Sequence, residues 1–469
     1  MSHVLIIGNG PAAHRLVERL REHGHDGPIT VLGAEHRPAY NRVLLASVLD
    51  GTLSPRSVTL PEPDAEVFLG AEATSLDPAR RLVRTADGVV HRYDELVLAT
   101  GARPVVPPIP GVRDDNGEPA EGVTALRTLD DCERVPDQGR AVVLGGGVLG
   151  VETARGLQGR GVDVALVHPK PHPMDRQLDS AAGALLAAHL REAGVRTELD
   201  RRAVEHRPGK LVLDDGRALE CDALVLCTGV SPEVSLARAA GLAVGRGVLV
   251  DDRMSTSDPH VHALGDCAEH DGRLPGLISP AWEQADVLAG ALTGGQRRYR
   301  PVGAVTRLKA RGIDLCAIGS AEHLDSAEPD VDLVTLSDPA RGRYAKLALR
   351  RDRVLAAALV GFPQAAATLC RLHDHDQPVP HDRLGLLLGA ATADRGSPAE
   401  LPADAVVCRC NNVTKKRLVR AFRDGARDVG GLARATRATT GCGGCGDDVR
   451  RLCAELRSDD TTTEQEGAA

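Results

Sequence analysis

Two parts of the chain repeat one order of elements: a short apolar strand, a turn rich in glycine, and an amphipathic helix. In the first part the apolar run spans residues 3–7, and a helical pattern continues to about residue 21. In the second part the run spans residues 141–144, and the helical pattern spans 148–159. Strands that alternate with helices predict parallel sheets, so the pattern indicates an α/β fold. Further buried strands are expected at 29–32, 162–167 and 223–226.

The pattern changes after about residue 300. Residues 300–375 mix strand and helix signals, and the apolar stretch at 346–361 reads as strand. Several Pro residues between 373 and 405 predict a linker, and two short helical patterns follow at 414–424 and 429–435. We therefore expect two further small domains after the α/β part.

The composition of the chain argues against several classes of function. The chain has 469 residues, with 42% hydrophobic and 26% charged residues and a net charge of −8, which argues against nucleic-acid binding as its main task. No apolar run approaches the roughly 20 residues of a membrane span, and no signal peptide is visible. Eleven cysteines are too sparse for a secreted disulfide scaffold, so we expect a cytoplasmic protein with no membrane partner.

The first turn reads Gly8-x-Gly10-x-x-Ala13. The first Gly permits a tight turn, the second lets the backbone approach a pyrophosphate, and Ala13 permits close packing of helix on strand. The helix N-terminus then offers free N–H groups and a positive dipole end to the phosphates. Glu35, just beyond the second strand, is placed to accept hydrogen bonds from ribose hydroxyls. These features predict a dinucleotide site.

The second turn repeats this pattern as Gly145-x-Gly147-x-x-Gly150, with Glu152 in the helix behind it. At the position expected to read the adenosine ribose, just after the next strand, stands His168 rather than Asp or Glu. An acid there favours NADH, whereas a nearby Arg favours NADPH. Lys170 is a candidate for contact with a 2′-phosphate, but the choice of coenzyme stays open.

Four cysteines near the C-terminus form C-x-C and C-x-x-C pairs separated by 31 residues: Cys408, Cys410, Cys442 and Cys445. Tetrahedral sulfur ligation suits zinc or an iron–sulfur cluster. Two nucleotide sites upstream favour the cluster, which would convert two-electron hydride chemistry into single-electron transfer. Cys453 is expected to be a helix residue and not a ligand.

Other segments carry a family resemblance. Strands at 96–101 and 261–266, which end in Thr100-Gly101 and Gly265-Asp266, resemble the flavoproteins with two dinucleotide-binding domains. AYNRVLLASVLDG, MDRQLD, GLISPAWEQADVLAG and TRLKARGIDLCAIGS resemble the nitrite reductase large subunits and the electron-transfer subunits of assimilatory nitrate reductases. CRCNNVTKKRL and TGCGGC resemble the [2Fe–2S] domain of bacterioferritin-associated ferredoxin.

The resemblance implies two Rossmann-like domains, a small α+β domain and a small helical [2Fe–2S] domain. The implied boundaries are 1–115 with 245–298 for FAD, 116–244 for NAD(P)H, 299–375 for the α+β domain, 376–404 for the linker, 405–456 for the cluster and 457–469 for a disordered tail. No cysteine precedes Cys132, so no redox-active disulfide is expected in the FAD domain.

The resemblance also implies roles for residues. Asp266 would contact the FAD ribityl chain or pyrophosphate, Arg42 the pyrophosphate, and Trp282 would lie near the isoalloxazine. Glu152 would lie near the nicotinamide end, although a solvated helix residue is an equal alternative. No catalytic side chain is expected, since the cofactors do the chemistry. The implied FAD residues are Gly8, Gly10, Pro11, Ala12, Ala13, Glu35, Arg42, Thr100, Gly101, Gly265, Asp266 and Trp282. The implied NAD(P)H residues are Gly145, Gly147, Leu149, Gly150, Glu152, His168 and Gly229.

The activity implied by the resemblance is transfer of electrons from NAD(P)H through FAD and [2Fe–2S] to a separate nitrate or nitrite reductase in nitrogen assimilation. Only 16 residues follow Cys453, so we expect no sirohaem domain and no nitrite reduction by this chain alone. A subunit of a small-amine oxidoreductase of the opine or glycine type is one alternative. A redox-sensing binding protein with a zinc or cluster module is another. The acceptor and the oligomeric state stay open.

Overall fold

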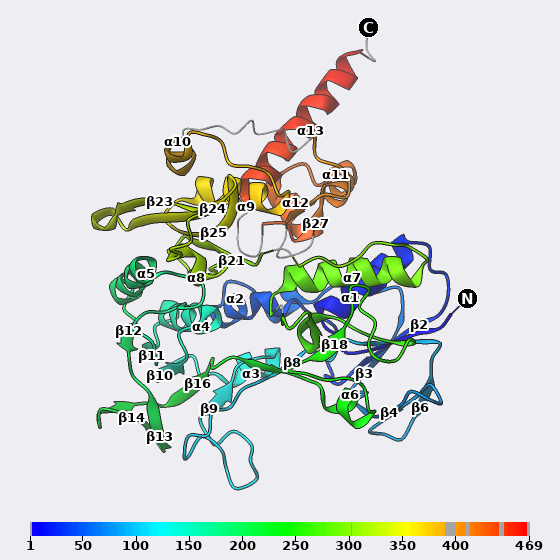
Figure 1. Cartoon of the computed structure of the whole chain (residues 1–469), viewed down its shortest axis with the longest axis horizontal. Coiled ribbons are helices and arrows are strands. Elements are labelled where there is room, and N and C mark those ends of the chain that lie inside the picture. The colour runs from blue at the N-terminus through cyan, green and yellow to red at the C-terminus, as the bar shows by residue number, and fades with distance from the viewer. Residues whose placement is uncertain are drawn as a thin grey trace. The chain divides into compact units, whose positions relative to one another are not determined.

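The computed structural model describes residues 2–274, 276–301, 303–389, 400–408, 413–439 and 445–466 (Figure 1). The chain divides into two compact units. The first unit comprises Met1–Lys170 and Gly194–Ala304, and the second comprises Pro171–Ala193 and Val305–Ala469. Among the described residues, no helix combines the length and hydropathy needed to cross a membrane.

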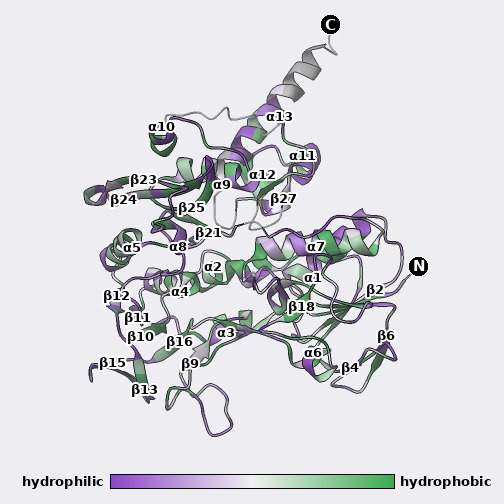
Figure 2. Ribbon diagram, in the orientation of Figure 1, coloured by the Kyte–Doolittle hydropathy of each residue, from purple (hydrophilic) through white to green (hydrophobic). Residues whose placement is uncertain are grey.

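The first parallel sheet of unit 1 has the order β19-β7-β1-β2-β3. Every neighbouring pair in it is parallel. Helices α1 (Pro11–Glu22) and α7 (Ile278–Leu292) pack on it, and their buried residues share one core cluster with the strands (Figure 2). The strands are β1 (Val4–Ile7), β2 (Ile29–Gly33), β3 (Glu66–Leu69), β7 (Glu95–Leu98) and β19 (Val261–Ala263).

The second parallel sheet of unit 1 has the order β12-β11-β10-β16-β9. Helix α4 (Val148–Gly159) packs on β10 and β11, with Val151, Ala154 and Leu157 fully buried. The predicted α/β fold with two parallel sheets is therefore confirmed. The strands are β9 (Val123–Ala125), β10 (Arg140–Leu144), β11 (Asp163–His168), β12 (Arg196–Leu199) and β16 (Ala223–Leu226).

Smaller sheets and short helices complete unit 1. The antiparallel ladders β4-β5-β6 and β13-β14-β15 each have three strands. In addition, β17 pairs with β8 in antiparallel orientation, and β18 pairs with β20 in parallel orientation. These strands are β4 (Ala73–Asp77), β5 (Leu82–Thr85), β6 (Val90–Arg92), β8 (Ala102–Pro104), β13 (Ala203–Arg207), β14 (Lys210–Leu213), β15 (Ala218–Glu220), β17 (Val230–Pro232), β18 (Val248–Val250) and β20 (Ala268–His270). The helices are α2 (Leu45–Leu49), α3 (Leu129–Arg134) and α6 (Ser235–Ala239).

Unit 2 contains an antiparallel sheet of order β21-β22-β25-β24-β23, as the mixed pattern after residue 300 predicts. Helix α5 (Ser180–Glu192) belongs to this unit, although its residues fall within the predicted NAD(P)H domain. The predicted linker also differs from the structure, because Leu386 and Leu387 of α10 are buried in the core of this sheet. The remaining elements are β21 (Val305–Arg307), β22 (Leu315–Ile318), β23 (Val331–Asp338), β24 (Arg343–Arg350), β25 (Arg353–Val360), α8 (Ala321–Leu324), α9 (Pro363–Asp374) and α10 (Arg383–Leu388).

Among the residues described from 400 onward, the C-terminal part of unit 2 contains three helices and one strand pair, which form a small domain. Leu418, Phe422 and Leu432 form its core together with Val449 and Leu452. The tail expected to be disordered from residue 457 is instead helical as far as Glu466. The elements are β26 (Val406–Cys408), β27 (Val413–Thr414), α11 (Lys415–Arg423), α12 (Val429–Thr436) and α13 (Gly446–Glu466).

Candidate cofactor sites

The carboxyl ends of the parallel strands in the first sheet bring the predicted FAD residues together. β1 ends directly before Gly8, β7 ends before Thr100 and Gly101, and β19 ends before Gly265. A Cβ built on Gly265 would lie 3.3 Å from the Cβ of Ala12, so the first glycine turn and the Gly-Asp motif are in contact. Because ligands of open α/β sheets bind at this edge, the arrangement is suited to a dinucleotide.

Gly8 and Gly10 differ in what a side chain would meet. Gly8 has φ +113°, and a Cβ there would lie 2.1 Å from the Ala99 carbonyl oxygen. Gly10 has φ −97°, and no described atom lies within 4 Å of its built Cβ. Among the described side chains, none caps the N-terminus of α1. The turn is therefore closed on the sheet side and open on the side where a pyrophosphate would approach, which fits the implied group.

Glu35, Tyr40 and Arg42 form a network beside this turn. The Tyr40 hydroxyl donates to Glu35 Oε2 over 2.8 Å and accepts from Arg42 Nη1 over 2.8 Å. Arg42 Nη2 also bonds Glu35 Oε1. Burial raises the pKa of Tyr40 well above its ordinary value, so its hydroxyl stays protonated and remains a donor to Glu35. The network holds the predicted ribose acceptor and the predicted pyrophosphate ligand together.

Asp266 has a partner that the sequence did not indicate. Arg127 Nη2 donates to Asp266 Oδ2 over 2.6 Å, and the two residues are 139 positions apart. Arg42 Nη1 donates to the Arg127 carbonyl oxygen over 3.4 Å, so this second Arg belongs to the same site. Trp282 lies half-buried on α7, and Thr100 donates through Oγ1 to the Glu233 carbonyl oxygen. The FAD roles of these residues stay predictions.

The second glycine turn packs more tightly against backbone carbonyl oxygens than the first turn does. A Cβ built on Gly150 would lie 1.8 Å from the Gly145 carbonyl oxygen, and one on Gly145 would lie 2.3 Å from that of Cys227. Around Gly147, by contrast, the described atoms leave 4 Å of open space. The turn thus packs on β16 and leaves the N-terminus of α4 open, as a second dinucleotide requires. Gly229, at φ +96°, lies beyond the end of β16, and Leu149 lies in the first turn of α4.

His168 and Glu152 are both buried here. The Gly146 N–H donates to His168 Nδ1 over 3.0 Å, which makes Nδ1 an acceptor and leaves the ring proton on Nε2. His168 is 8% exposed, and its imidazole lies directly beneath the glycine turn. Glu152 is 4% exposed, so the alternative of a solvated helix residue is wrong. A buried carboxyl on the helix behind the turn is a stronger functional candidate than an exposed one.

The structure describes two of the four predicted cluster ligands. Cys408, at the end of β26, is fully buried, and Cys445 is 5% exposed; both belong to the core cluster of the small domain. The Thr439 N–H donates to Cys445 Sγ over 3.3 Å, as expected for a sulfur that carries negative charge. Cys410 and Cys442 lie outside the described residues. Cys453 lies in α13, which agrees with its predicted position in a helix; that it is not a ligand stays a prediction.

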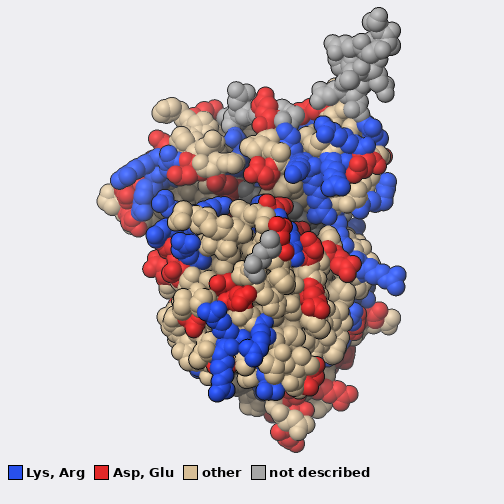
Figure 3. Space-filling view, turned by 90° about the vertical axis from the view of Figure 1, so that its right-hand side faces the viewer, with Lys and Arg blue, Asp and Glu red and all other residues tan. Residues whose placement is uncertain are grey.

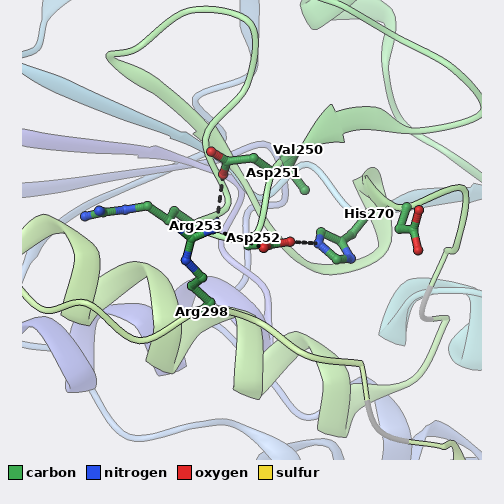
Figure 4. A pocket seen from close by; sticks show the side chains of 7 residues that line it. Val250, Asp251, Asp252, Arg253, His270 and Arg298 are labelled. Carbon is green, nitrogen blue, oxygen red and sulfur yellow. Dashed lines mark hydrogen bonds and ion pairs between the residues drawn. The ribbon is translucent and has the colours of Figure 1, made fainter.

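A separate pocket of about 470 Å³ opens on unit 1 and contains none of the predicted residues. Its lining includes three acidic residues, Asp251, Asp252 and Asp271, and two arginines, Arg253 and Arg298 (Figure 4). Asp252 Oδ1 lies 2.9 Å from His270 Nε2, and this hydrogen bond lowers the pKa of Asp252. Because Asp252 already pairs with both His270 and Arg298, the pocket is a weaker ligand candidate than the two open turns.

Three family models match successive parts of the chain. A model of the pyridine nucleotide-disulphide oxidoreductase family matches residues 2–285. A model of the rubredoxin NAD+ reductase C-terminal domain matches residues 305–372, and a model of the BFD-like [2Fe-2S] binding domain matches residues 406–455. The last match spans all four predicted cysteine ligands.

Curated relatives from Bacillus subtilis cover nearly all of the chain. Its nitrite reductase [NAD(P)H] is 32% identical over 461 residues, which are 94% of this chain and 56% of the relative. Its assimilatory nitrate reductase electron transfer subunit is 31% identical, over 94% of this chain and 58% of the relative. The chain thus spans little more than half the length of these relatives.

Among solved structures, the reductase chain of a covalent putidaredoxin reductase–putidaredoxin complex is 26% identical. It has a TM-score of 0.73 and covers 84% of this chain and 99% of its own. NADH:rubredoxin oxidoreductase from Clostridium acetobutylicum is 25% identical, with a TM-score of 0.67, and covers 83% and 99%. Both likenesses extend beyond the two parallel sheets to most of the chain.

Proposed function

The chain belongs to the pyridine nucleotide-disulphide oxidoreductase family, and we propose that it transfers electrons from NAD(P)H, through FAD and a [2Fe–2S] cluster, to a nitrate- or nitrite-reducing centre. One observation carries the proposal. Two glycine turns, each closed on its sheet and open at the helix N-terminus, precede a domain in which Cys408 and Cys445 lie in one buried cluster. When bound, FAD accepts a hydride from the nicotinamide and supplies single electrons to the cluster.

The side chains of this protein would bind and orient the cofactors. At the first turn, Gly10 leaves space for the FAD pyrophosphate, and Arg42 and Arg127 supply positive charge beside the carboxylates of Glu35 and Asp266. At the second turn, Gly147 would admit the NAD(P)H pyrophosphate. No side-chain acid or base is required for hydride transfer, since both reacting atoms belong to cofactors.

The acceptor is proposed from the relatives. Two relatives that cover 94% of this chain are named nitrite reductase and assimilatory nitrate reductase electron transfer subunit. The second of these names describes an electron transfer subunit, which supports our proposal that the nitrate- or nitrite-reducing centre lies on a separate catalytic partner. A cytoplasmic location is part of the proposal, because the source of electrons is NAD(P)H.

The small-amine alternative leaves the second turn without a ligand. No described atom lies within 4 Å of a Cβ built on Gly147, whereas a Cβ on Gly150 would overlap the Gly145 carbonyl oxygen. A tight turn with an open helix N-terminus suits a pyrophosphate, and it favours NAD(P)H as the electron source. The alternative of a zinc-containing sensor leaves both open turns without a task.

Three cysteine variants test the proposed path. Protein purified without oxygen should contain two irons and two acid-labile sulfides per chain. Cys408→Ser and Cys445→Ser should lose cluster absorbance, keep rapid flavin reduction by NAD(P)H, and lose nitrate or nitrite reduction in a mixture with the partner enzyme. Cys453→Ser is the matched control, since its buried Sγ donates to the Arg427 carbonyl oxygen over 3.6 Å and is not a predicted ligand. Stoichiometric zinc without iron, or an undiminished coupled rate in Cys408→Ser, would contradict the proposal.

A further inference from the structure

The cluster-binding domain is basic within an acidic chain. Residues 406–455 contain eleven Lys and Arg and five Asp and Glu, whereas the whole chain has a net charge of −8. A cluster held by four thiolates is anionic, and some of these cations offset it. Charge compensation explains cations near the cysteines, but it does not explain cations that point into solvent on the far side of a helix.

Helix α11 carries such cations on one face. Lys416, Arg420 and Arg423 are exposed, and their i, i+4, i+7 spacing places them in one stripe. Leu418 and Phe422 are buried on the opposite face. Figure 2 shows α11 as largely hydrophilic. Figure 3, which presents the right-hand side of Figure 1, shows Lys and Arg side chains gathered in its upper part. We call these three residues the basic stripe.

Helix stability accounts for only part of the basic stripe. Arg420 and Arg423 lie in the last turn of α11, where the macrodipole favours cations. Lys416 lies in the first turn, where the macrodipole favours acids, and that turn contains Lys415, Lys416 and Arg417 and no acid. Like charges at i and i+4, as at Lys416 and Arg420, also destabilise a helix. The described ion pair of the stripe, Arg420 with Asp424, spans 3.8 Å between side chains 84% and 69% exposed, so it stabilises little.

The basic stripe begins next to a cluster ligand. Val413 is the partner of Cys408 in the β26–β27 ladder, and Thr414 caps α11 by accepting from the Arg417 N–H. The Lys416 N–H donates to the Ala403 carbonyl oxygen over 2.7 Å, which fixes the start of the helix against the segment that leads into β26. A molecule bound to the stripe would therefore lie beside the strand that carries Cys408.

We propose that the basic stripe is the docking surface for the acidic face of a protein that accepts electrons from the cluster. This inference rests on the proposed function and adds how the acceptor is recognised. One NAD(P)H would reduce two acceptor molecules by one electron each, with release of NAD(P)+ and one proton. A local positive patch on an acidic protein orients an acidic partner, because other approaches are repelled.

A protein acceptor fits better than a nucleic acid. The stripe spans eight residues of one helix, or about 10 Å at 1.5 Å per residue, which suits contact with one acidic patch. Specific duplex binding rests on about six to ten phosphate contacts, and a chain of net charge −8 repels a polyanion that extends beyond the stripe. Duplex DNA therefore serves as a competing ligand in the test.

The test compares K416Q/R420Q/R423Q with R92Q/R297Q/R351Q in the full chain. The control triple removes the same charge at three exposed arginines far from α11 in the sequence. The probes are soluble cytochrome b5, an acidic one-electron haem protein, and cytochrome c, a basic one. Calorimetric binding of oxidised cytochrome b5 and its rate of reduction by NADH or NADPH are measured from low to physiological salt. Reduction of an uncharged dye by the same samples reports the reductase itself.

We expect neutralising the stripe to weaken cytochrome b5 binding and slow its reduction by about tenfold at low salt, with a flatter salt dependence. Dye reduction, cytochrome c reduction and the control triple should stay at the level of the unmodified protein. Equal loss in both triples, or no loss in the stripe variant, overturns the inference. So does tighter binding of a 20-base-pair duplex than of cytochrome b5 at physiological salt. Absence of flavin and dye reduction in the unmodified protein would instead contradict the proposed function, and the binding data would still decide the stripe.

Discussion

The two glycines of the first turn should fail in different ways when each is replaced by alanine. At Gly8, a Cβ would lie 2.1 Å from the Ala99 carbonyl oxygen, so the contact must open by about 0.9 Å to reach the 3.0 Å limit of real Cβ contacts. The residue also has φ +113°, which L side chains rarely adopt. Overpacking costs about 1–3 kcal/mol and the backbone conformation about 1–2 kcal/mol, so Gly8→Ala should destabilise the apoprotein by about 2–5 kcal/mol.

At Gly10 the same methyl group meets no described atom within 4 Å, and φ −97° is available to alanine. As the N-cap of α1, alanine in place of glycine should cost less than about 1 kcal/mol. The methyl group would, however, stand where the backbone must approach the pyrophosphate. Gly10→Ala should therefore weaken FAD binding at least about tenfold, equivalent to about 1.4 kcal/mol, with little change in the apoprotein.

The assay separates these two effects. FAD is removed, thermal unfolding of each apoprotein is followed by circular dichroism, and FAD is titrated back with its fluorescence as the signal. Gly8→Ala should lower the apoprotein midpoint by about 5–15 °C, and Gly10→Ala by only a few degrees. Gly290→Ala in α7 is the control, since its Cβ has 4 Å of free space among the described atoms. Unchanged FAD affinity in Gly10→Ala, or an unchanged midpoint in Gly8→Ala, would refute the reasoning.

Two further predictions concern the coenzyme and acid stability. His168→Glu places a carboxylate at the end of β11 and should raise the ratio of kcat/KM for NADH to that for NADPH by about tenfold, measured by stopped-flow flavin reduction; an unchanged ratio would exclude this residue as the ribose reader. Burial opposes ionisation of Glu95, but its bonds with His262 and His260 outweigh burial and lower its pKa. At pH values above the pKa of Glu95 in the unfolded chain, this pairing stabilises the fold, and the stabilisation is lost as the pH falls through the pKa of Glu95 in the folded protein. Glu95→Gln should therefore flatten the fall of the unfolding midpoint below about pH 4.5. An equally steep fall in the variant would contradict this prediction.

Sequence patterns located the turns and sheets because each depends on local features. Gly8, Gly145 and Gly150 stand where a side chain would overlap a carbonyl oxygen, so glycine at these positions marks the turn by itself. The apolar runs before them became buried parallel strands, and the helical patterns ended within one or two residues of α1, α4, α11 and α12. Local chemistry of this kind can be read without knowledge of tertiary contacts.

Features that depend on distant contacts were missed. Arg127 lies in no motif, and its relevance follows only from an ion pair with a residue 139 positions away. The burial of Glu152 depends on how α4 packs, and its charge suggested solvent exposure instead. The Pro-rich segment before residue 404 contains α10, and two of the four leucines of α10, Leu386 and Leu387, pack into a sheet that the segment itself does not form. In each case contacts with residues distant in the sequence determined the structure, and the local sequence pattern did not indicate them.

At the edge of the first sheet where FAD is predicted to bind, two carboxylates lie beside the expected site of an anionic pyrophosphate. The structure indicates how the repulsion between these negative charges is reduced. Glu35 and Asp266 are the predicted acceptors for the cofactor's hydroxyls, and a pyrophosphate bound between them would face repulsion from both. Each carboxylate already has its own guanidinium, Arg42 or Arg127, and Arg42 also bonds the backbone of Arg127. Charge compensation is therefore built into the protein before the cofactor binds, and the two arginines, joined through that bond, are placed to serve the pyrophosphate as well. Removal of either Arg would leave a partly buried carboxylate without its guanidinium partner. We therefore propose that this pairing is as important to FAD binding as the glycines themselves.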